Sequence, residues 1–196
     1  MSRLREIVLA MTLLLSTGIV RSEPVTYTFV TKLSRVMFTV DHSGFSNPFG
    51  IMKLAPGTFV FDEKDWSKSS VTVTLHTSTL DMGDELWNKQ IRGDESWETL
   101  FKAKDIVFRS TRLERKDESH GTLHGDLTLA GITRPVALEL HVNKIAVNHF
   151  SSLPWIGFSA TATVKRSQFG LGAYGPYIGE DIPLHIEIEG AVGDPK

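Results

Sequence analysis

The sequence predicts a mainly β protein of about eight antiparallel strands with one short helical segment. The first observation is an alternation of apolar and polar residues, such as Leu127 and Leu129 against Asp126 and Thr128. Successive strand residues face opposite sides of a sheet, so this alternation is typical of a strand with one buried face. The pattern recurs along most of the chain, and only one segment breaks it.

The N-terminal residues have the layout of a secretory signal peptide. Arg3 and Arg5 precede an apolar run from residue 7 to residue 20, and the small residue Ser22 follows it. The run is shorter than the roughly 20 apolar residues that span a membrane. We therefore expect a signal peptide over 1–22, export to the periplasm, and a mature chain of residues 23–196 that forms one domain.

The composition of the mature chain narrows the classes of partner. Removal of residues 1–22 leaves 18 basic and 22 acidic residues, a net charge of −4 with histidine neutral. This balance disfavours a nucleic-acid partner. The chain has no cysteine, so the exported domain holds together without disulfides. No second apolar run follows the first, so we expect a soluble protein that does not span a membrane. The oligomeric state stays open, a homodimer included.

The clearest alternation lies in the middle and at the C-terminal end of the chain. It predicts strands over 71–75, 125–129, 136–142, 156–164 and 184–188. Gly131 to Pro135 indicates a turn or bulge between two of these strands. Shorter or noisier strands are expected over 25–31, 34–42, 58–62 and 105–114.

Eight strands with one apolar face can form a flat sandwich or close into a barrel. Closure removes the exposed edges, and an eight-stranded barrel can hold one small ligand. The apolar face then covers either a packed core or a lipophilic cavity. The side chains expected in a cavity are Phe38, Val40, Phe45, Val73, Leu75, Phe108, Leu127, Leu129, Leu138, Leu140, Phe158, Ala160 and Phe169.

Residues 82–104 break the alternation. Acidic residues come early in each half of this segment, which predicts two short helices hinged at Gly93. We expect the segment to lie across one opening of a barrel and to cover the interior with its large apolar side chains, which are Leu86, Trp87, Trp97 and Phe101. Simple packing of the helices on the barrel is the competing interpretation.

Few residues have the spacing that catalysis or metal binding requires. His120 and His124 are four residues apart, about 13 Å on a strand, so they cannot share one ion and no metal site is predicted. The sequence has no G-x-S-x-G elbow, no cysteine nucleophile and no dinucleotide fingerprint. We therefore expect no cofactor and no enzymatic activity. The alternative is an exported enzyme that uses His42 or Asp84 as a general base on a lipophilic substrate.

His42 is the first of two candidates for contact with a lipid head group. It ends an apolar strand before a Gly-rich turn and stands near Phe45 and Phe49. A histidine among aromatic residues at a barrel mouth suits a polar head group. The competing interpretation is a histidine that hydrogen-bonds to the backbone of the turn.

Arg166 is the second candidate. It follows an alternating strand in "VKRSQFGLG", where its planar guanidinium suits a phosphate. The competing interpretation is an ion pair with Asp84 or Asp181. The following "GLGAYGPYIG" is expected to be a long loop that closes one end of the barrel.

Three motifs resemble those of the YceI-like family of exported polyisoprenoid-binding proteins. In the family's order, they are "DIVFRST" (105–111), "LHGDLTLAGITRPVALEL" (123–140) and "GFSATATVKRSQFG" (157–170). The resemblance covers nearly the whole mature chain and includes the helical segment. Leu33 stands where the family usually has the histidine of D-x-x-H-S, whereas Phe38, Val40 and His42 match the family's F-x-V-x-H.

The resemblance implies a lipocalin-like eight-stranded barrel and a lipophilic ligand, and it supplies no shared catalytic set. The leading hypothesis is an exported carrier that encloses a long apolar lipid. A polyisoprenoid, either quinone-like or an isoprenyl phosphate, and a fatty acyl derivative are the candidate ligands. A filled barrel that acts through its surface is a further alternative.

Overall fold

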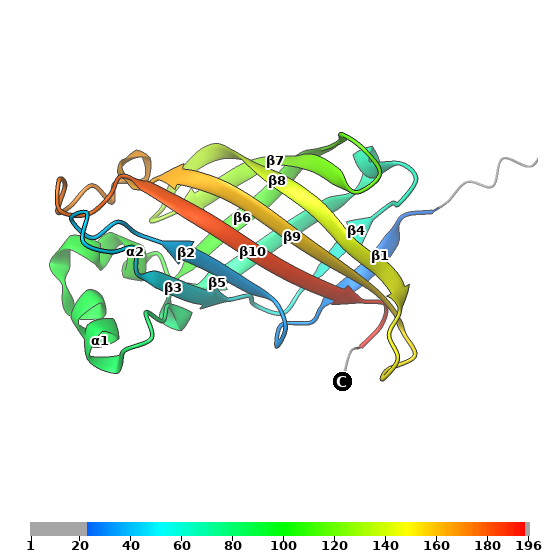
Figure 1. Cartoon of the computed structure of the whole chain (residues 1–196), viewed down its shortest axis with the longest axis horizontal. Coiled ribbons are helices and arrows are strands. Elements are labelled where there is room, and N and C mark those ends of the chain that lie inside the picture. Colours follow the sequence, from blue (N-terminus) through cyan, green and yellow to red (C-terminus); the bar gives the residue numbers. More distant parts are fainter. Residues whose placement is uncertain (1–22, 195–196) are drawn as a thin grey trace, which may run out of the picture.

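The alternating segments pair into an antiparallel sheet that closes on itself (Figure 1). The structure is a computed structural model and describes residues 23–194. Within this range the strands are β1 (Val25–Phe29), β2 (Arg35–Thr39), β3 (Phe49–Lys53), β4 (Thr58–Phe61), β5 (Ser70–His76), β6 (Asp105–Arg115), β7 (His120–Leu129), β8 (Ile132–Val147), β9 (Pro154–Lys165) and β10 (Asp181–Ala191). Strand β1 and strands β4 to β10 form a closed ring of eight, which confirms the predicted barrel.

Two strands of the barrel are interrupted, and each continues as a separate strand. Strands β1 and β2 both pair with β10, through Phe29 and Gly190 and then through Arg35 and Glu187. They are two halves of one interrupted strand, and β4 and β3 pair with them in the same way. At the break the buried Ser34 hydroxyl donates to the Val30 carbonyl and accepts from the Glu189 N–H.

Strand β3 was missed at the sequence level, where its first residues were taken as part of a turn. Its inward positions are Gly50 and Met52, and a Cβ on Gly50 would lie 2.3 Å from Cζ of Phe38. The Phe38 ring therefore occupies the space of the missing side chain, a common use of glycine in a strand. Glycine replaces the expected apolar residue, so the alternation is lost from the sequence.

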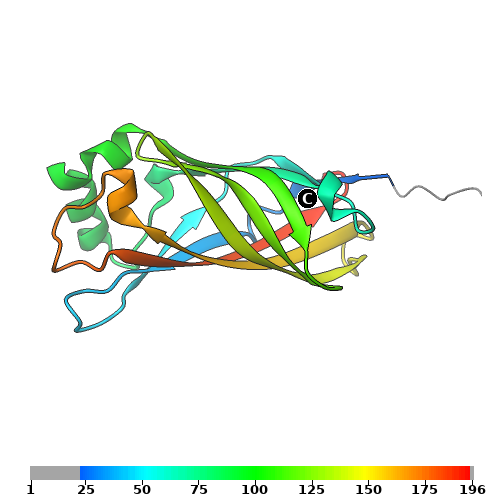
Figure 2. The same ribbon diagram turned by 90° about the horizontal axis from the view of Figure 1, so that it is seen from above.

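Aromatic side chains pack one end of the barrel. Trp66 lies in a 3-10 turn, η1 (Trp66–Lys68), at the end opposite to α1 (Figure 2). Its ring contacts that of Phe61, which in turn contacts Phe158, with centroids 5.5 and 5.3 Å apart. A Cβ on Gly121 would lie 2.7 Å from Trp66, so only glycine leaves room for the indole. This end is a packed core.

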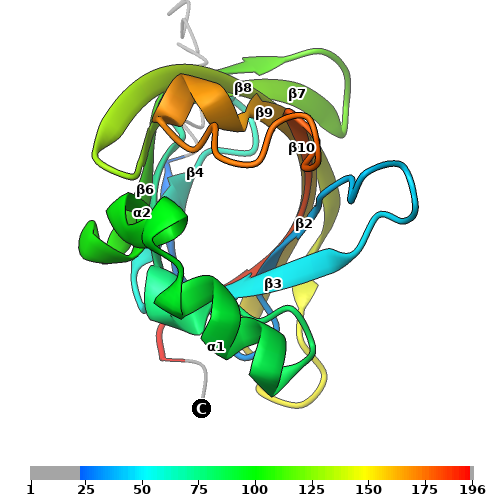
Figure 3. The same ribbon diagram turned by 90° about the vertical axis from the view of Figure 1, so that its left-hand side faces the viewer.

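The other end carries the helices, as predicted. They are η2 (Thr77–Thr79), α1 (Glu85–Gly93), η3 (Glu95–Trp97), α2 (Glu98–Lys102) and η4 (Arg166–Phe169). Asp84 begins α1 by accepting a hydrogen bond from the Trp87 N–H, and α1 ends at the predicted hinge, Gly93. Figure 3 looks at this end, where α1, α2, the β2–β3 hairpin and the segment from η4 to β10 surround the opening.

No helix within residues 23–194 combines the length and the apolar character needed to cross a membrane. The expected signal peptide, residues 1–22, lies outside the described residues.

Candidate functional site: an apolar cavity with a polar mouth

The inward faces of the strands enclose a cavity of about 750 Å³ above the packed aromatic end. The predicted residues that line it are Phe38, Val40, Val73, Leu75, Trp97, Phe108, Leu127, Leu129, Leu138, Leu140, Phe158 and Ala160. Almost all of them stand on strands, where a period of two leaves one inward face. The apolar face of the barrel therefore covers both a packed core and a cavity.

Four residues expected in the cavity do not line it. Phe45 is 88% exposed at the tip of the β2–β3 turn, and Leu86 faces solvent in the first turn of α1. Phe101 lies beside a separate shallow depression, and Phe169 is fully buried in η4 without reaching the cavity. The strand period does not extend to turns, and in a helix Leu86 points about 100° away from its neighbour Trp87, which does line the cavity.

Other lining residues were not predicted. Leu184, Ile186 and Ile188 face the cavity from β10, and Ile91 faces it from α1, beside the predicted Trp87. The β10 residues show the same alternation as the predicted set, so a signal for them was present. The spacing of four between Trp87 and Ile91 marks one face of a helix.

Most of the polar lining residues stand on the segments around the opening. They are Asp41, His42, Gln90, Asp94, Arg166, Tyr174 and Tyr177. His42 forms a β-bridge with Ile178, and the Asp41 carbonyl accepts from the Gly179 N–H at 2.9 Å. The structure thus brings His42 and Arg166 to the same mouth, as the sequence predicted.

Arg166 anchors the loop that follows it. Its side chain is buried and donates to the carbonyls of Gly179, Leu171, Ala173 and Ile178 at 2.5 to 2.8 Å. A guanidinium has five N–H groups, so one Nη2–H is left after these four bonds. A two-pronged contact with a phosphate is therefore not open to Arg166 in this arrangement.

The expected ion-pair alternatives for Arg166 are also wrong. Asp181 pairs with Lys165 at 2.7 Å, and Asp84 caps α1. Backbone carbonyls, which all residues share, take the place of the expected carboxylate.

A second polar contact crosses the mouth between Tyr174 and Asp94. The Tyr174 hydroxyl donates to Asp94 Oδ2 at 2.6 Å, and the Ser96 N–H donates to Oδ1 at 2.8 Å. These hydrogen bonds hold the pKa of Asp94 below its ordinary value, so the carboxylate stays ionised at neutral pH.

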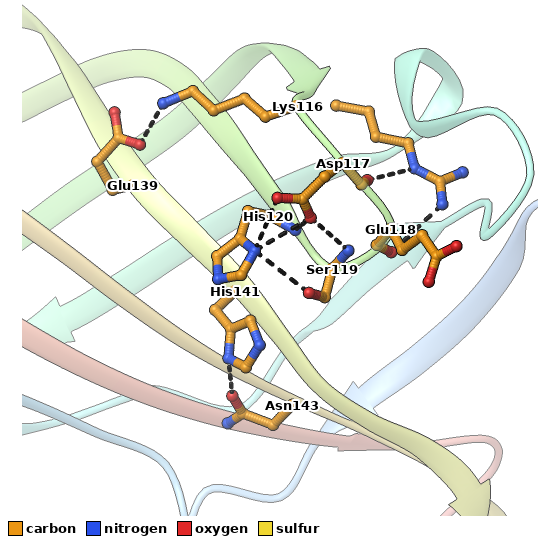
Figure 4. A network of polar contacts seen from close by, with 9 residues as sticks. Lys116, Asp117, Glu118, Ser119, His120, Glu139, His141 and Asn143 are labelled. Carbon is orange, nitrogen blue, oxygen red and sulfur yellow. Dashed lines mark hydrogen bonds and ion pairs between the residues drawn. The ribbon is translucent and has the colours of Figure 1, made fainter.

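His120 and His141 stand on neighbouring strands, and their side chains make exposed polar contacts (Figure 4). His120 on β7 and His141 on β8 stack with ring centroids 4.5 Å apart. Nδ1 of His120 lies 3.0 Å from Asp117 Oδ1, and Nδ1 of His141 lies 2.8 Å from Asn143 Oδ1. His124 contacts Glu114 instead. In the described part of the chain, no group of three or more histidine, aspartate or glutamate side chains is placed to hold a metal ion.

The fold and the site together define a class of protein: a small closed antiparallel barrel with an apolar cavity whose polar groups gather at its open end. The family model of the YceI-like domain matches residues 27–190. The chain belongs to the YceI-like family, which confirms the resemblance seen in its motifs.

Known proteins share sequence or fold with this chain. The UPF0312 protein of Serratia proteamaculans is 33% identical over 160 residues, which cover 79% of each chain. The crystal structure of Burkholderia cenocepacia BcnA superposes with a TM-score of 0.68 at 16% identity, over 80% of this chain and 95% of the other. A polyisoprenoid binding domain from Saccharophagus degradans superposes with a TM-score of 0.60 at 11% identity, over 85% and 98%.

Proposed function

We propose that this protein is an exported carrier that holds one long apolar lipid, with the tail in the cavity and the head group at the mouth. The observation that carries the proposal is the apolar cavity of about 750 Å³ with polar side chains grouped around its opening. Burial contributes about 25 cal/mol per Å² of apolar surface, so a long tail needs few polar contacts. The similar fold of a polyisoprenoid binding domain supports a polyisoprenoid as the ligand, and a fatty acyl chain suits the same cavity.

The mouth favours a neutral head group. Arg166 has one N–H left for a ligand, and the carboxyl groups of Asp41 and Asp94 line the same opening. A pyrophosphate at this opening would meet two like-charged side chains, and like charges repel. A quinone or alcohol needs only single hydrogen bonds, which Arg166 and His42 are placed to supply. Of the two polyisoprenoid classes, the quinone-like one is therefore proposed.

The helical segment is proposed as the cover of the cavity. Trp87 and Trp97 both line it, and the Trp97 ring lies 6.0 Å from that of Tyr174 on the opposite side of the mouth. Trp97→Ala should lower the amount of bound lipid while the circular dichroism spectrum stays unchanged. An unchanged lipid content would leave packing of the helices as their only role.

Carriage is favoured over catalysis. Asp84 caps α1 and is not among the lining residues. His42 is exposed, and its hydrogen bonds within residues 23–194 are made by its backbone. Neither residue has the partnered geometry of a general base.

The test uses protein purified from its native host and extracted with organic solvent. An intact lipid in one-to-one ratio supports a carrier, whereas conversion of an added quinone or acyl lipid would support an enzyme. A lipid-free extract, together with a melting temperature that added lipid does not raise, would favour a filled barrel that acts through its surface.

A further inference from the structure

Five large apolar side chains are exposed on the three segments that frame the cavity mouth. We call them the rim: Phe45, Phe49, Leu86, Tyr174 and Tyr177. Phe45 is 88% exposed, and Leu86 and Tyr177 are 68% and 66% exposed. Such side chains normally avoid water, so their grouping at the functional end indicates a contact surface.

The three rim segments form one continuous edge around the opening (Figure 3). The Ser43 N–H donates to the Tyr177 carbonyl at 2.9 Å, which joins the β2–β3 turn to the loop before β10. The Tyr174 hydroxyl joins that loop to Asp94 at the end of α1. Tyr174 and Tyr177 are exposed and also line the cavity, so the rim is continuous with the cavity wall.

From this arrangement we infer that the rim docks on the surface of a lipid bilayer, so that the ligand passes between bilayer and cavity without crossing water. The inference rests on the proposed function. The rim side chains stand on the β2–β3 turn and the start of β3, on the first turn of α1 and on the loop before β10, with polar residues between them, which suits insertion into a lipid interface. Phe and Tyr are favoured at such interfaces, where ring and hydroxyl meet apolar and wet surroundings. A bilayer is also where a lipid of the proposed kind resides.

Charge decides which bilayer surface fits. The rim segments, residues 41–49, 81–97 and 171–180, contain seven Asp or Glu residues and two Lys or Arg residues. A negative surface is repelled by anionic lipids, and the repulsion weakens as salt screens it. The docking surface therefore fits neutral, zwitterionic lipids and depends on apolar insertion.

The test is sedimentation of the purified protein with phosphatidylcholine vesicles. Wild type should bind, and replacing one third of the lipid by phosphatidylglycerol should weaken binding at low salt. The double variant Phe45→Ser and Tyr177→Ser should bind about tenfold more weakly, because two exposed rings no longer enter the lipid. The matched control is Phe150→Ser, which removes a 99% exposed ring from the β8–β9 turn at the opposite end and should bind like wild type.

Mass spectrometry of bound lipid in the same samples separates the docking inference from the proposed function. If wild-type protein contains lipid but binds vesicles of neither composition, the docking inference is wrong and a protein acceptor is indicated. The carrier function would not be affected by this result. The inference would also be wrong if the double variant bound vesicles as tightly as wild type, or if Phe150→Ser lost as much binding as the double variant. Stronger binding of wild type to the anionic vesicles would contradict it as well. Protein that binds vesicles but never contains lipid would instead contradict the carrier function.

Discussion

The Tyr174 hydroxyl donates a hydrogen bond of 2.6 Å to Asp94 Oδ2, and this contact joins the two sides of the cavity mouth. Tyr174 stands on the loop that Arg166 anchors, and Asp94 stands between α1 and η3. A lipid that enters or leaves between these two elements has to separate them. The contact is therefore expected to slow ligand exchange.

Tyr174→Phe removes the hydroxyl and keeps the ring beside Trp97. One hydrogen bond fewer has to break when the mouth opens, so lipid release should become several-fold faster. The measurement is transfer of a bound fluorescent lipid to acceptor vesicles. Tyr177→Phe is the matched control, because no side-chain hydrogen bond of Tyr177 is present within residues 23–194, and its release rate should match wild type. Equal lipid-release rates in the two variants would contradict the expectation that the Tyr174–Asp94 hydrogen bond slows ligand exchange.

Arg166→Gln should destabilise the fold. The change leaves several buried carbonyls around the loop without donors, and each buried unpaired acceptor costs about 1–3 kcal/mol. We expect a loss on the order of 3 kcal/mol in the free energy of unfolding, measured in urea. Lys165→Gln, which removes only an exposed ion pair with Asp181, should change little. A stable Arg166→Gln protein would show that the loop does not depend on this anchor.

The sequence predicts those parts of the protein in which apolar and polar residues alternate along a strand. Leu138 and Leu140 could be placed inside because a half-buried strand has one inward face. Phe45 could not, because its turn has no period. The partners of Arg166 were hidden because backbone carbonyls leave no trace in the sequence. The β3 strand was hidden because Gly50 interrupts its apolar pattern where the ring of Phe38 needs space.

Gly125→Ala should destabilise the barrel by about 1–3 kcal/mol through overpacking. A Cβ at this position would lie 2.4 Å from the Arg109 carbonyl oxygen and 2.4 Å from Cζ of Phe108. The Arg109 oxygen belongs to the backbone of the neighbouring strand β6, so it cannot move away without disturbing the sheet. The matched control is Gly157→Ala, another strand glycine, whose nearest contact would be 3.8 Å away. Thermal unfolding of the two variants compares them, and equal melting temperatures would contradict the prediction.

Asp117 should make stability depend on pH in the acid range. The N–H groups of Ser119 and His120, together with the His120 ring, lower the pKa of Asp117 from 3.8 to about 2. A carboxyl group whose pKa is lower in the folded state stabilises above its unfolded pKa and loses this effect as pH falls through the folded value. Wild type should therefore exceed Asp117→Asn in stability at pH 7, and the difference should vanish between about pH 4 and pH 2. Acid unfolding of both proteins measures it, and a constant difference across that window would contradict the assignment.

Native mass spectrometry of wild type and of Ala160→Trp tests the central claim, that the cavity holds a lipid. Ala160 is buried on β9 and faces the cavity, so an indole there occupies the space of the proposed tail. Thr161→Trp places the same group on the outer face of the same strand and is the control for folding. We predict one lipid bound per protein in wild type and Thr161→Trp, and a loss of bound lipid in Ala160→Trp with an unchanged circular dichroism spectrum. Equal lipid content in a folded Ala160→Trp protein, or no lipid in wild type purified from its host, would contradict the account.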